Sequence, residues 1–328
     1  MKFAFTFLLI LLMLTGGAFP LGNPVSVFPV SEAPGAYGLR KCLLPGSSAT
    51  LHFVECPELY QEGLDTLTKT IFWRTLVNTG KDTLIFYGFP SRNILSVRSA
   101  DNWDSLNPEM KNCALDSMRS RLTVDDEKVS YMRGRNYFYN VKAVVPQINR
   151  AVQIFGEQNT DPFYAQAILL IESPGRLQKS TVGAYGPFQL MKSVGKQFGL
   201  KVNSRIDERA DLEKSAIAAT RLINRVCIPY ANKMLGTYNI AVCPTDLWYR
   251  LLVLHIYHAG AGNVSRALSL IQPETGNMDL IKKLWHTRAG GFQNASQNYS
   301  QIAIATLLEL DNHLKDLESG QASLSYEN

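Results

Sequence analysis

Glu172 is the residue of this sequence best suited to acid–base chemistry. It follows an apolar run within Ala-Ile-Leu-Leu-Ile-Glu-Ser, residues 167–173. A carboxylate placed behind apolar residues loses part of its hydration, and a desolvated carboxylic acid keeps its proton to higher pH. Such a group can protonate a leaving oxygen, so the segment predicts a general acid. Taken alone, a Glu at a helix end is more often a solvated surface residue.

Two further segments carry polar groups and glycines that could complete a site around this acid. One is Ser-Thr-Val-Gly-Ala-Tyr-Gly-Pro-Phe-Gln-Leu-Met, residues 180–191, and the other is His-Ile-Tyr-His-Ala-Gly-Ala-Gly-Asn-Val, residues 255–264. Glycine permits tight turns and close backbone approach, so both segments can present hydroxyl and amide groups to a ligand. The alternatives are that these glycines only form turns and that Tyr257, at helical spacing from Val253, is a core residue.

In this order, the three segments resemble those of lytic transglycosylases of the soluble-lytic-transglycosylase type, which have a lysozyme-like fold. Residues 172–173 match the family's Glu-Ser at a helix end. Residues 180–191 are similar to Ser-x-x-Gly-Ala-x-Gly-Leu-Met-Gln-Leu-Met, and residues 255–264 to Ala-Ala-Tyr-Asn-Ala-Gly-Pro-Gly-x-Val. The resemblance covers residues 140–312, and residues 298–308 resemble the tail of the membrane-bound D-type branch.

The resemblance implies a mechanism and a set of site residues. Glu172 would be the sole acid and base: it protonates the leaving oxygen of a MurNAc-β-1,4-GlcNAc bond and then takes the proton of the muramic C6 hydroxyl. The product would carry a 1,6-anhydro end. The implied substrate-binding residues supply two hydroxyls, a glycine that admits the glycan, an aromatic face and an amide: Ser180, Tyr257, Gly186, Phe188 and Gln189. No metal and no cofactor are implied.

The sequence departs from the family pattern at three places near these residues. The segment between Glu172 and Ser180 is slightly shorter than usual and lacks the common Asn-Pro, and Pro187 stands where Leu is usual. His258 replaces the Asn that follows Tyr257, which changes the hydrogen bonding available there. None of these departures removes the acid, so the predicted activity is retained.

Other titratable residues have structural explanations beside functional ones. The acidic residues within 207–211 could supply a second catalytic carboxylate, although capping of the following helix is favoured. His255 and His258 have a spacing that suits metal binding on a helix, but no carboxylate stands at the fitting position. The cysteines could form disulfides 42–56 and 227–243 in an oxidising compartment, leaving Cys113 free, or all five could be reduced.

Composition and the start of the chain indicate an exported globular protein. Of the 328 residues, 46% are hydrophobic and 19% charged, and the net charge of +5 is spread along the chain without the Lys/Arg block of a nucleic-acid binder. Lys2, the apolar run 3–14 and the small residues that follow are typical of a secretory signal. We therefore expect export to the periplasm or cell envelope and no transmembrane segment in the mature chain. An uncleaved anchor is the alternative.

The elements that must position the site residues are mainly helical. Asp161-Pro162 supplies a helix cap and a first-turn proline before the helix that ends near Glu172. Further helices are expected over residues 144–155, 188–198, 211–226, 245–257 and 296–317, and before them helices over 66–78 and 107–122 and a strand over 83–87.

The predicted fold class is mainly α: a lysozyme-like catalytic domain, residues 136–318, preceded by a small α+β accessory region, residues 41–135. The remaining segments are a signal peptide (1–18), an extended leader (19–40) and a disordered tail (319–328). The accessory region has no predicted role, and envelope proteins are possible partners for it.

The function predicted from these residues is peptidoglycan cleavage by a lytic transglycosylase that acts on glycan strands. Two alternatives remain at this point. One is a lysozyme-type hydrolase of the same fold, which would leave reducing ends instead of anhydro ends. The other is a non-catalytic protein that binds or scaffolds peptidoglycan.

Overall fold

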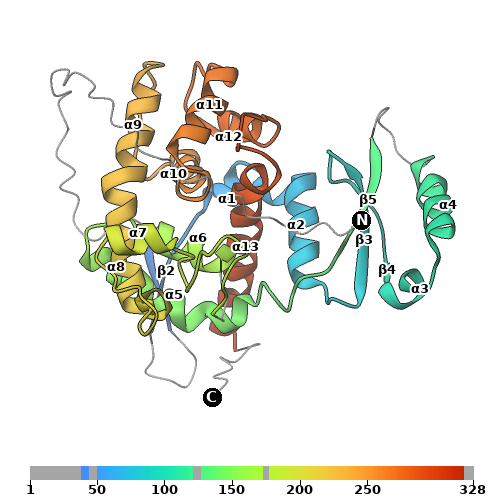
Figure 1. The fold of residues 1–328 in the computed structure, drawn as a ribbon, viewed down its shortest axis with the longest axis horizontal. Helices are drawn as coiled ribbons and strands as arrows, with labels where there is room; N and C mark the ends of the chain where they lie inside the picture. The colour runs from blue at the N-terminus through green and yellow to red at the C-terminus, as the bar shows by residue number, and fades with distance from the viewer. Residues whose placement is uncertain (1–37, 44–49, 121–126, 173–176, 321–328) are drawn as a thin grey trace.

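The computed structural model describes residues 38–43, 50–120, 127–172 and 177–320, and within them the chain is mainly helical with two small antiparallel sheets (Figure 1). The predicted fold class, mainly α after a small α+β region, is confirmed. The predicted signal peptide, nearly all of the predicted leader, Ser173 and most of the predicted tail lie outside the described residues. Within the described ranges, no helix combines the length and the apolar character needed to cross a membrane.

The N-terminal part alternates short strands and helices. In chain order its elements are β1 (Leu39–Leu43), β2 (Thr50–Val54), α1 (Glu58–Gln61), the 3₁₀ turn η1 (Leu64–Thr66), α2 (Thr68–Asn78), β3 (Thr83–Phe89), β4 (Ile94–Ser99), α3 (Ala100–Asp104), α4 (Pro108–Arg119) and β5 (Lys128–Arg133). β1 pairs antiparallel with β2, and the second sheet has the order β4-β3-β5, also antiparallel. The strand and the two helices predicted here are confirmed within a few residues.

β3 is the central strand of the second sheet because its side chains are apolar on both faces. Phe86 faces α3 and packs edge-on against Trp103, with ring centroids 4.8 Å apart. Tyr87, on the opposite face, contacts Phe72 of α2 at 4.5 Å. This alternation places the sheet between α2 on one side and α3 and α4 on the other (Figure 1).

From residue 141 onward the described chain is built of helices joined by short segments. The elements are α5 (Val141–Glu157), α6 (Phe163–Glu172), α7 (Lys192–Gln197), the 3₁₀ turn η2 (Glu208–Ala210), α8 (Leu212–Leu222), the π-helical segment η3 (Ile223–Cys227), α9 (Ile228–Gly236), α10 (Leu247–Ala259), α11 (Ala261–Ile271), α12 (Met278–Leu284) and α13 (Asn294–Glu318). The helix predicted over 188–198 is shorter than expected. Tyr185 and Leu190 exchange backbone hydrogen bonds and Gln189 has a φ of +43°, so the helix begins only at Lys192.

α6 is the central helix of the molecule, and every one of its residues is buried. It packs against α5, α10 and α13, as expected for a helix that is apolar all round. The predicted cap is confirmed, because the Phe163 N–H donates to Asp161 Oδ1 at 3.0 Å. Asp161 also accepts from Arg250 of α10, whose Nε lies 2.7 Å from Oδ2, and both side chains are buried. The buried ion pair ties the start of α6 to α10.

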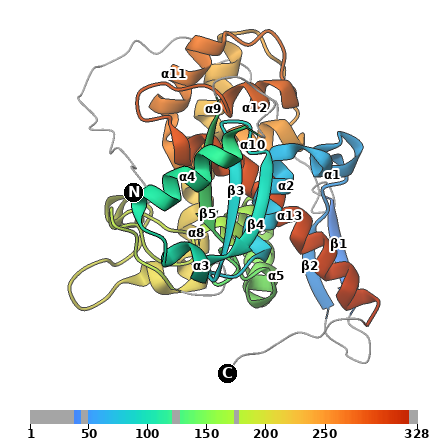
Figure 2. The same cartoon turned by 90° about the vertical axis from the view of Figure 1, so that its right-hand side faces the viewer.

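Apolar residues of β1, β2 and α2 pack into the same apolar core as the later helices. Gln166 of α6 forms two hydrogen bonds of 2.9 Å with the backbone of Val54 in β2. α2 lies along α13, where Trp73 Nε1 donates to Gln301 Oε1 at 3.0 Å. β1 and β2 lie beside the C-terminal end of α13 (Figure 2). Half of the predicted accessory region therefore shares the helical core, while the predicted boundary at 135/136 stays a prediction.

All five cysteines have free thiols, so neither disulfide considered from the sequence is formed. Cys227 is buried within η3, whereas Cys243 is exposed. Burial raises the pKa of Cys42 to about 11 and that of Cys56 and Cys227 to about 12. These three thiols therefore stay protonated and unreactive at neutral pH.

His255 makes the stability of the fold depend on pH. It is fully buried, its Nε2 lies 2.8 Å from Ser300 Oγ, and burial, with a smaller effect from His258, lowers its pKa from 6.5 to about 3. Between pH 6.5 and about 3, His255 binds a proton in the unfolded chain but stays neutral in the native state. We therefore expect this residue alone to lower the free energy of unfolding by about 1.4 kcal/mol for each pH unit as the pH falls.

The measurement is urea unfolding of the wild type and His255→Gln at several pH values between 6.5 and 3. The difference in free energy of unfolding between the two proteins at each pH reports the titration of His255, because the carboxylates titrate in both. The wild type should lose stability more steeply than the variant on acidification. Equal slopes would contradict the assignment.

Candidate functional site

Glu172 is the last residue of α6, and its side chain is 8% exposed. Its Oε1 accepts a hydrogen bond of 2.8 Å from the hydroxyl of Tyr299 in α13. His258 Nδ1 of α10 lies 3.9 Å from the same oxygen, and the His258 ring stacks on Tyr299 with centroids 4.3 Å apart. Three neighbouring helices thus bring together one carboxyl, one phenol and one imidazole (Figure 1).

The Glu172 carboxyl group lies among buried tyrosines. Burial, followed by the charge of Glu172, raises the pKa of Tyr257 and Tyr299 well above its usual value. Burial raises the pKa of Tyr139 to about 12, with a further contribution from Glu172 that Arg135 opposes. These phenols stay protonated, so Tyr299 is a constant hydrogen-bond donor to the carboxyl group.

Removing the Tyr299 hydroxyl tests this hydrogen bond. We expect Tyr299→Phe to fold normally, because the ring keeps its packing against His258. If glycan cleavage is the reaction, as the sequence predicts, the variant should be about tenfold slower, because one hydrogen bond to a charged group contributes about 1.5 kcal/mol. The measurement is the turnover rate on purified peptidoglycan. A variant with the wild-type rate would show that the hydrogen bond does not serve the reaction.

Ser180 and Gln189 lie in the loop that joins α6 to α7, and both are half-buried. The Ser180 hydroxyl oxygen accepts from the Ala184 N–H at 2.9 Å. Gln189 Nε2 donates to the carbonyls of Gln178 and Gly186, at 2.8 and 2.9 Å. Both side chains stabilise the loop in this structure, and their contact with glycan stays a prediction.

Tyr257 connects α10 to this loop. Its hydroxyl donates to the carbonyl oxygen of Phe188 at 2.6 Å. The expectation that Phe188 offers an aromatic face to a sugar is wrong, because its side chain is completely buried and its ring stacks on Phe155 with centroids 5.6 Å apart. Burial of an aromatic ring is strongly favourable, and the Phe188 ring is buried against Phe155 of α5.

Gly186 permits a close approach between two parts of the backbone, not between the backbone and a sugar. Its φ is +84°, and a Cβ at this position would lie 1.7 Å from the backbone oxygen of Arg209. The predicted reason, close approach of the sugar, is therefore corrected to packing of the loop against η2. Arg209 is 3% exposed and donates through Nη1 to the carbonyls of Gly183 and Leu190, both at 2.8 Å. Arg209 holds the loop in place, and nothing in its own sequence neighbourhood predicts this role.

A pair of matched substitutions tests the packing at Gly186. Gly186→Ala should lower the free energy of unfolding by about 3 kcal/mol or more, since the new methyl group meets a backbone oxygen. Gly183 also has a positive φ, +91°, but nothing lies within 4 Å of its Cβ position. Gly183→Ala should therefore cost only the backbone penalty of about 1–2 kcal/mol. Urea unfolding of both variants measures the difference, and equal losses would contradict it.

The acidic residues within 207–211 are engaged in the fold. Asp207 pairs with Arg209 at 2.7 Å, and Glu208 pairs with Lys214 at 2.8 Å. Asp211 caps α8 by accepting from the Lys214 N–H at 2.9 Å. The favoured prediction of a capping role is confirmed for Asp211. Among the described residues, no group of three or more His, Cys, Asp or Glu side chains could hold a metal ion.

The segment that carries Glu172 and the loop also matches a known family. Residues 153–276 match the family model described as the transglycosylase SLT domain. This chain carries an SLT domain. The match begins within α5 and ends after α11, so it contains every predicted site residue. No curated protein matches the chain.

The SLT domain supports a lytic-transglycosylase type of function that acts on peptidoglycan, and it agrees with the lysozyme-like fold expected from the resemblance. The match does not distinguish the D-type branch, which stays a prediction. Tyr299 lies outside the matched residues and 127 positions from Glu172 along the chain. Its hydroxyl nevertheless contacts Glu172, which lies within the matched residues.

Proposed function

We propose that the SLT domain cleaves the MurNAc-β-1,4-GlcNAc bond of peptidoglycan with Glu172 as its sole acid and base, and that it releases 1,6-anhydro-MurNAc ends. The observation that carries this proposal is the environment of Glu172, whose carboxyl group is buried at the end of α6 and accepts a hydrogen bond from Tyr299. The acidic residues within 207–211, the alternative source of a second carboxylate, have partners of their own.

Two proton transfers complete the reaction. The protonated Glu172 carboxyl gives its proton to the glycosidic oxygen as the bond between that oxygen and muramic C1 breaks, and the GlcNAc hydroxyl leaves. The Glu172 carboxylate then takes the proton of the muramic C6 hydroxyl while O6 forms the new bond to C1. Glu172 ends in its starting state, and no water is consumed. Most glycosidases instead use a second carboxylate.

Tyr299 and His258 support both states of the acid. Because the Tyr299 hydroxyl donates to Oε1, the transferable proton is carried by Oε2. When Glu172 has given up its proton, the same hydrogen bond becomes charge-assisted and stronger. His258, with Nδ1 at 3.9 Å, adds a second polar group on the same side of the carboxylate.

The substrate-binding contacts of Ser180, Gln189 and Tyr257, and export to the periplasm or cell envelope, belong to the same proposal. Peptidoglycan lies outside the inner membrane, so an enzyme that acts on it must leave the cytoplasm. Fractionation of cells that produce the full chain tests export. Recovery of the chain only in the cytoplasm would refute it.

The experiment that tests the reaction is mass spectrometry of purified peptidoglycan after digestion by the protein. Products that end in 1,6-anhydromuramic acid are expected. Products heavier by one water, with reducing muramic ends, would make the protein a hydrolase. If the folded protein released no soluble product, the remaining function would be peptidoglycan binding without catalysis.

A further inference from the structure

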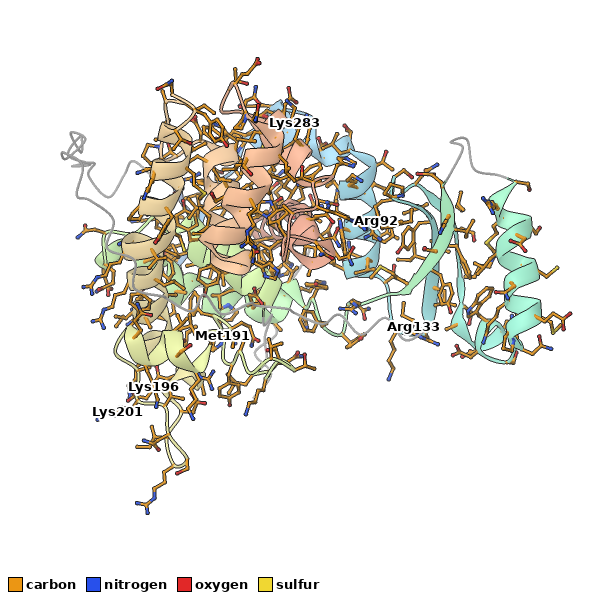
Figure 3. All side chains as sticks on the ribbon, turned by 45° about the horizontal axis from the view of Figure 1, so that its top comes forward. Arg92, Arg133, Met191, Lys196, Lys201 and Lys283 are labelled. Carbon is orange, nitrogen blue, oxygen red and sulfur yellow. The ribbon has the colours of Figure 1, made fainter. Side chains whose placement is uncertain are left out.

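A pocket of about 260 Å³ lies where the N-terminal part of the chain meets α12 and α13. Lys69 of α2 and Arg92 of the turn between β3 and β4 form one wall. Arg288, from the segment after α12, and Asn298 of α13 form the other. Figure 3 labels Arg92 between the helical part of the chain and the sheet, and Lys283 apart from it. No residue proposed for the cleavage reaction lines the pocket.

Arg92 is a buried cation at this pocket. Its side chain is 7% exposed, and its guanidinium lies over several aromatic rings, including those of Phe72 at 4.9 Å and Tyr87 at 4.8 Å. No carboxylate of the described residues forms an ion pair with it, and burial lowers its pKa. A buried charge without an opposite charge is costly to the fold, so its position favours binding of an anion from outside.

Asn298 of α13 is a second polar group of the pocket lining, and it is 7% exposed. Its carboxamide can donate to a ligand in the pocket. Two other amides of α13 bond within the chain: Gln297 donates to Thr287 O at 2.8 Å, and Gln301 accepts from Trp73. An amide that lines the pocket together with a buried guanidinium suits a ligand that accepts hydrogen bonds.

The charge around the pocket favours an anion. Lys69, Arg92 and Arg288 line it, together with the titratable His286. Burial, and next the charge of Arg92, lowers the pKa of Lys69 to about 8, while Glu127 opposes this shift. Glu127 accepts a hydrogen bond of 3.0 Å from the Ser91 N–H and does not line the pocket. Cations therefore outnumber the one nearby carboxylate.

We propose that this pocket binds a carboxylate of the peptide stem that the muramic acid of a glycan strand carries. The proposal rests on peptidoglycan being the substrate. Arg92 would pair with the carboxylate and Asn298 would donate to it, the chemistry by which guanidinium and amide groups recognise carboxylates. The pocket extends the substrate contacts from the sugars to the peptide.

The position of the pocket relative to Glu172 suits such a stem. Asn298 precedes Tyr299 on α13, and Tyr299 contacts Glu172. Asn298, which lines the pocket, is therefore the direct neighbour along α13 of the residue that contacts Glu172 of α6. An extended peptide spans about 3.3–3.6 Å per residue, so a stem places its carboxylate several such steps away from the muramic acid.

Calorimetry tests the pocket without turnover. The probe is N-acetylmuramoyl-L-alanyl-D-isoglutamine, compared with the same molecule after amidation of its free carboxylate. We expect the wild type to bind the free acid at least tenfold more tightly. Asn298→Asp, which is isosteric and repels a carboxylate, and Lys69→Gln should remove this preference. Lys283→Gln is the matched control, because Lys283 is exposed on α12 and does not line the pocket.

Equal affinity of the wild type for the two probes would overturn the proposal, as would an unchanged preference in both folded pocket variants. Inorganic phosphate provides a further arm: binding of phosphate without binding of the muramyl peptide would assign the pocket to another anion. Circular dichroism shows whether each variant is folded. Lys69→Gln keeps the test decisive if Asn298→Asp does not fold.

A turnover assay separates this proposal from the proposed reaction. Glycan strands with intact stems are compared with strands from which an amidase has removed them. The wild type should have a lower KM for stem-bearing strands, and Lys69→Gln should lose that difference while keeping the rate on bare strands. Anhydro products without any stem preference would refute the pocket's role alone, whereas stem-dependent binding without products would refute the reaction alone.

Discussion

Glu172→Gln should lower the rate of glycan cleavage by at least about 10²–10⁴-fold while the protein stays folded. The amide oxygen of Gln can still accept the hydrogen bond that Tyr299 donates to Oε1. Its amide nitrogen, however, cannot give a proton to a glycosidic oxygen or take one from the C6 hydroxyl. The substitution therefore removes both proton transfers and little of the packing at the end of α6.

The measurement is the initial rate of release of soluble products from purified peptidoglycan, with unfolding curves to confirm the fold. Glu274→Gln is the control, since Glu274 is exposed after α11 and the chemical change is the same. The control should keep the wild-type rate. If Glu172→Gln retained a rate within a few-fold of the wild type, Glu172 would not be the acid.

The position of Glu172 at the end of a buried helix could be predicted because its signals are local. Asp161 begins α6, an unbroken apolar run follows, and Glu172 ends the helix, all within one short segment. Helix caps and apolar runs act between residues close in sequence, so their consequences can be inferred without the fold. The same reason explains why the other long helices were located within a few residues.

The contacts of Glu172 could not be predicted, because they join distant parts of the chain. Tyr299 stands 127 residues after Glu172, and nothing in its own neighbourhood shows which carboxyl group it contacts. Phe188 and Gly186 were misinterpreted for a related reason. Each stands in a segment whose pattern indicates glycan contact, but Phe155 and the backbone of Arg209 occupy the space beside them. Only tertiary packing decides which neighbour such residues meet.

The N-terminal region shows the same limit. Its strands and helices were recognised from their own patterns, yet Val54 and Trp73 contact Gln166 and Gln301 of the helical core. Hydrogen bonds of this kind carry no sequence signature, because a glutamine on a helix reads as surface. The pocket at Arg92 exists only because these two parts of the chain meet there.

Asp161→Asn should lower the free energy of unfolding by about 3–5 kcal/mol, the cost of breaking a buried ion pair by removing one charge. Asp161 and Arg250 are 8% and 3% exposed, and their closest atoms are 2.7 Å apart. Asn caps helices about as well as Asp, so the bond from the Phe163 N–H is kept. The loss therefore reports the charge of Asp161 and not its capping role.

Urea unfolding of Asp161→Asn, beside Glu213→Gln, measures this effect. Glu213 pairs with Arg150 at the same distance of 2.7 Å, but the side chains are 58% and 42% exposed, so its loss should cost at most about 1 kcal/mol. The Asp161–Arg250 pair fixes the start of the helix that ends in Glu172. Asp161→Asn should therefore lower the temperature at which cleavage activity is lost, and it should lower the melting temperature by the same amount. Equal losses in the free energy of unfolding of the two variants would contradict the prediction, because the buried ion pair would then matter no more to stability than the exposed one.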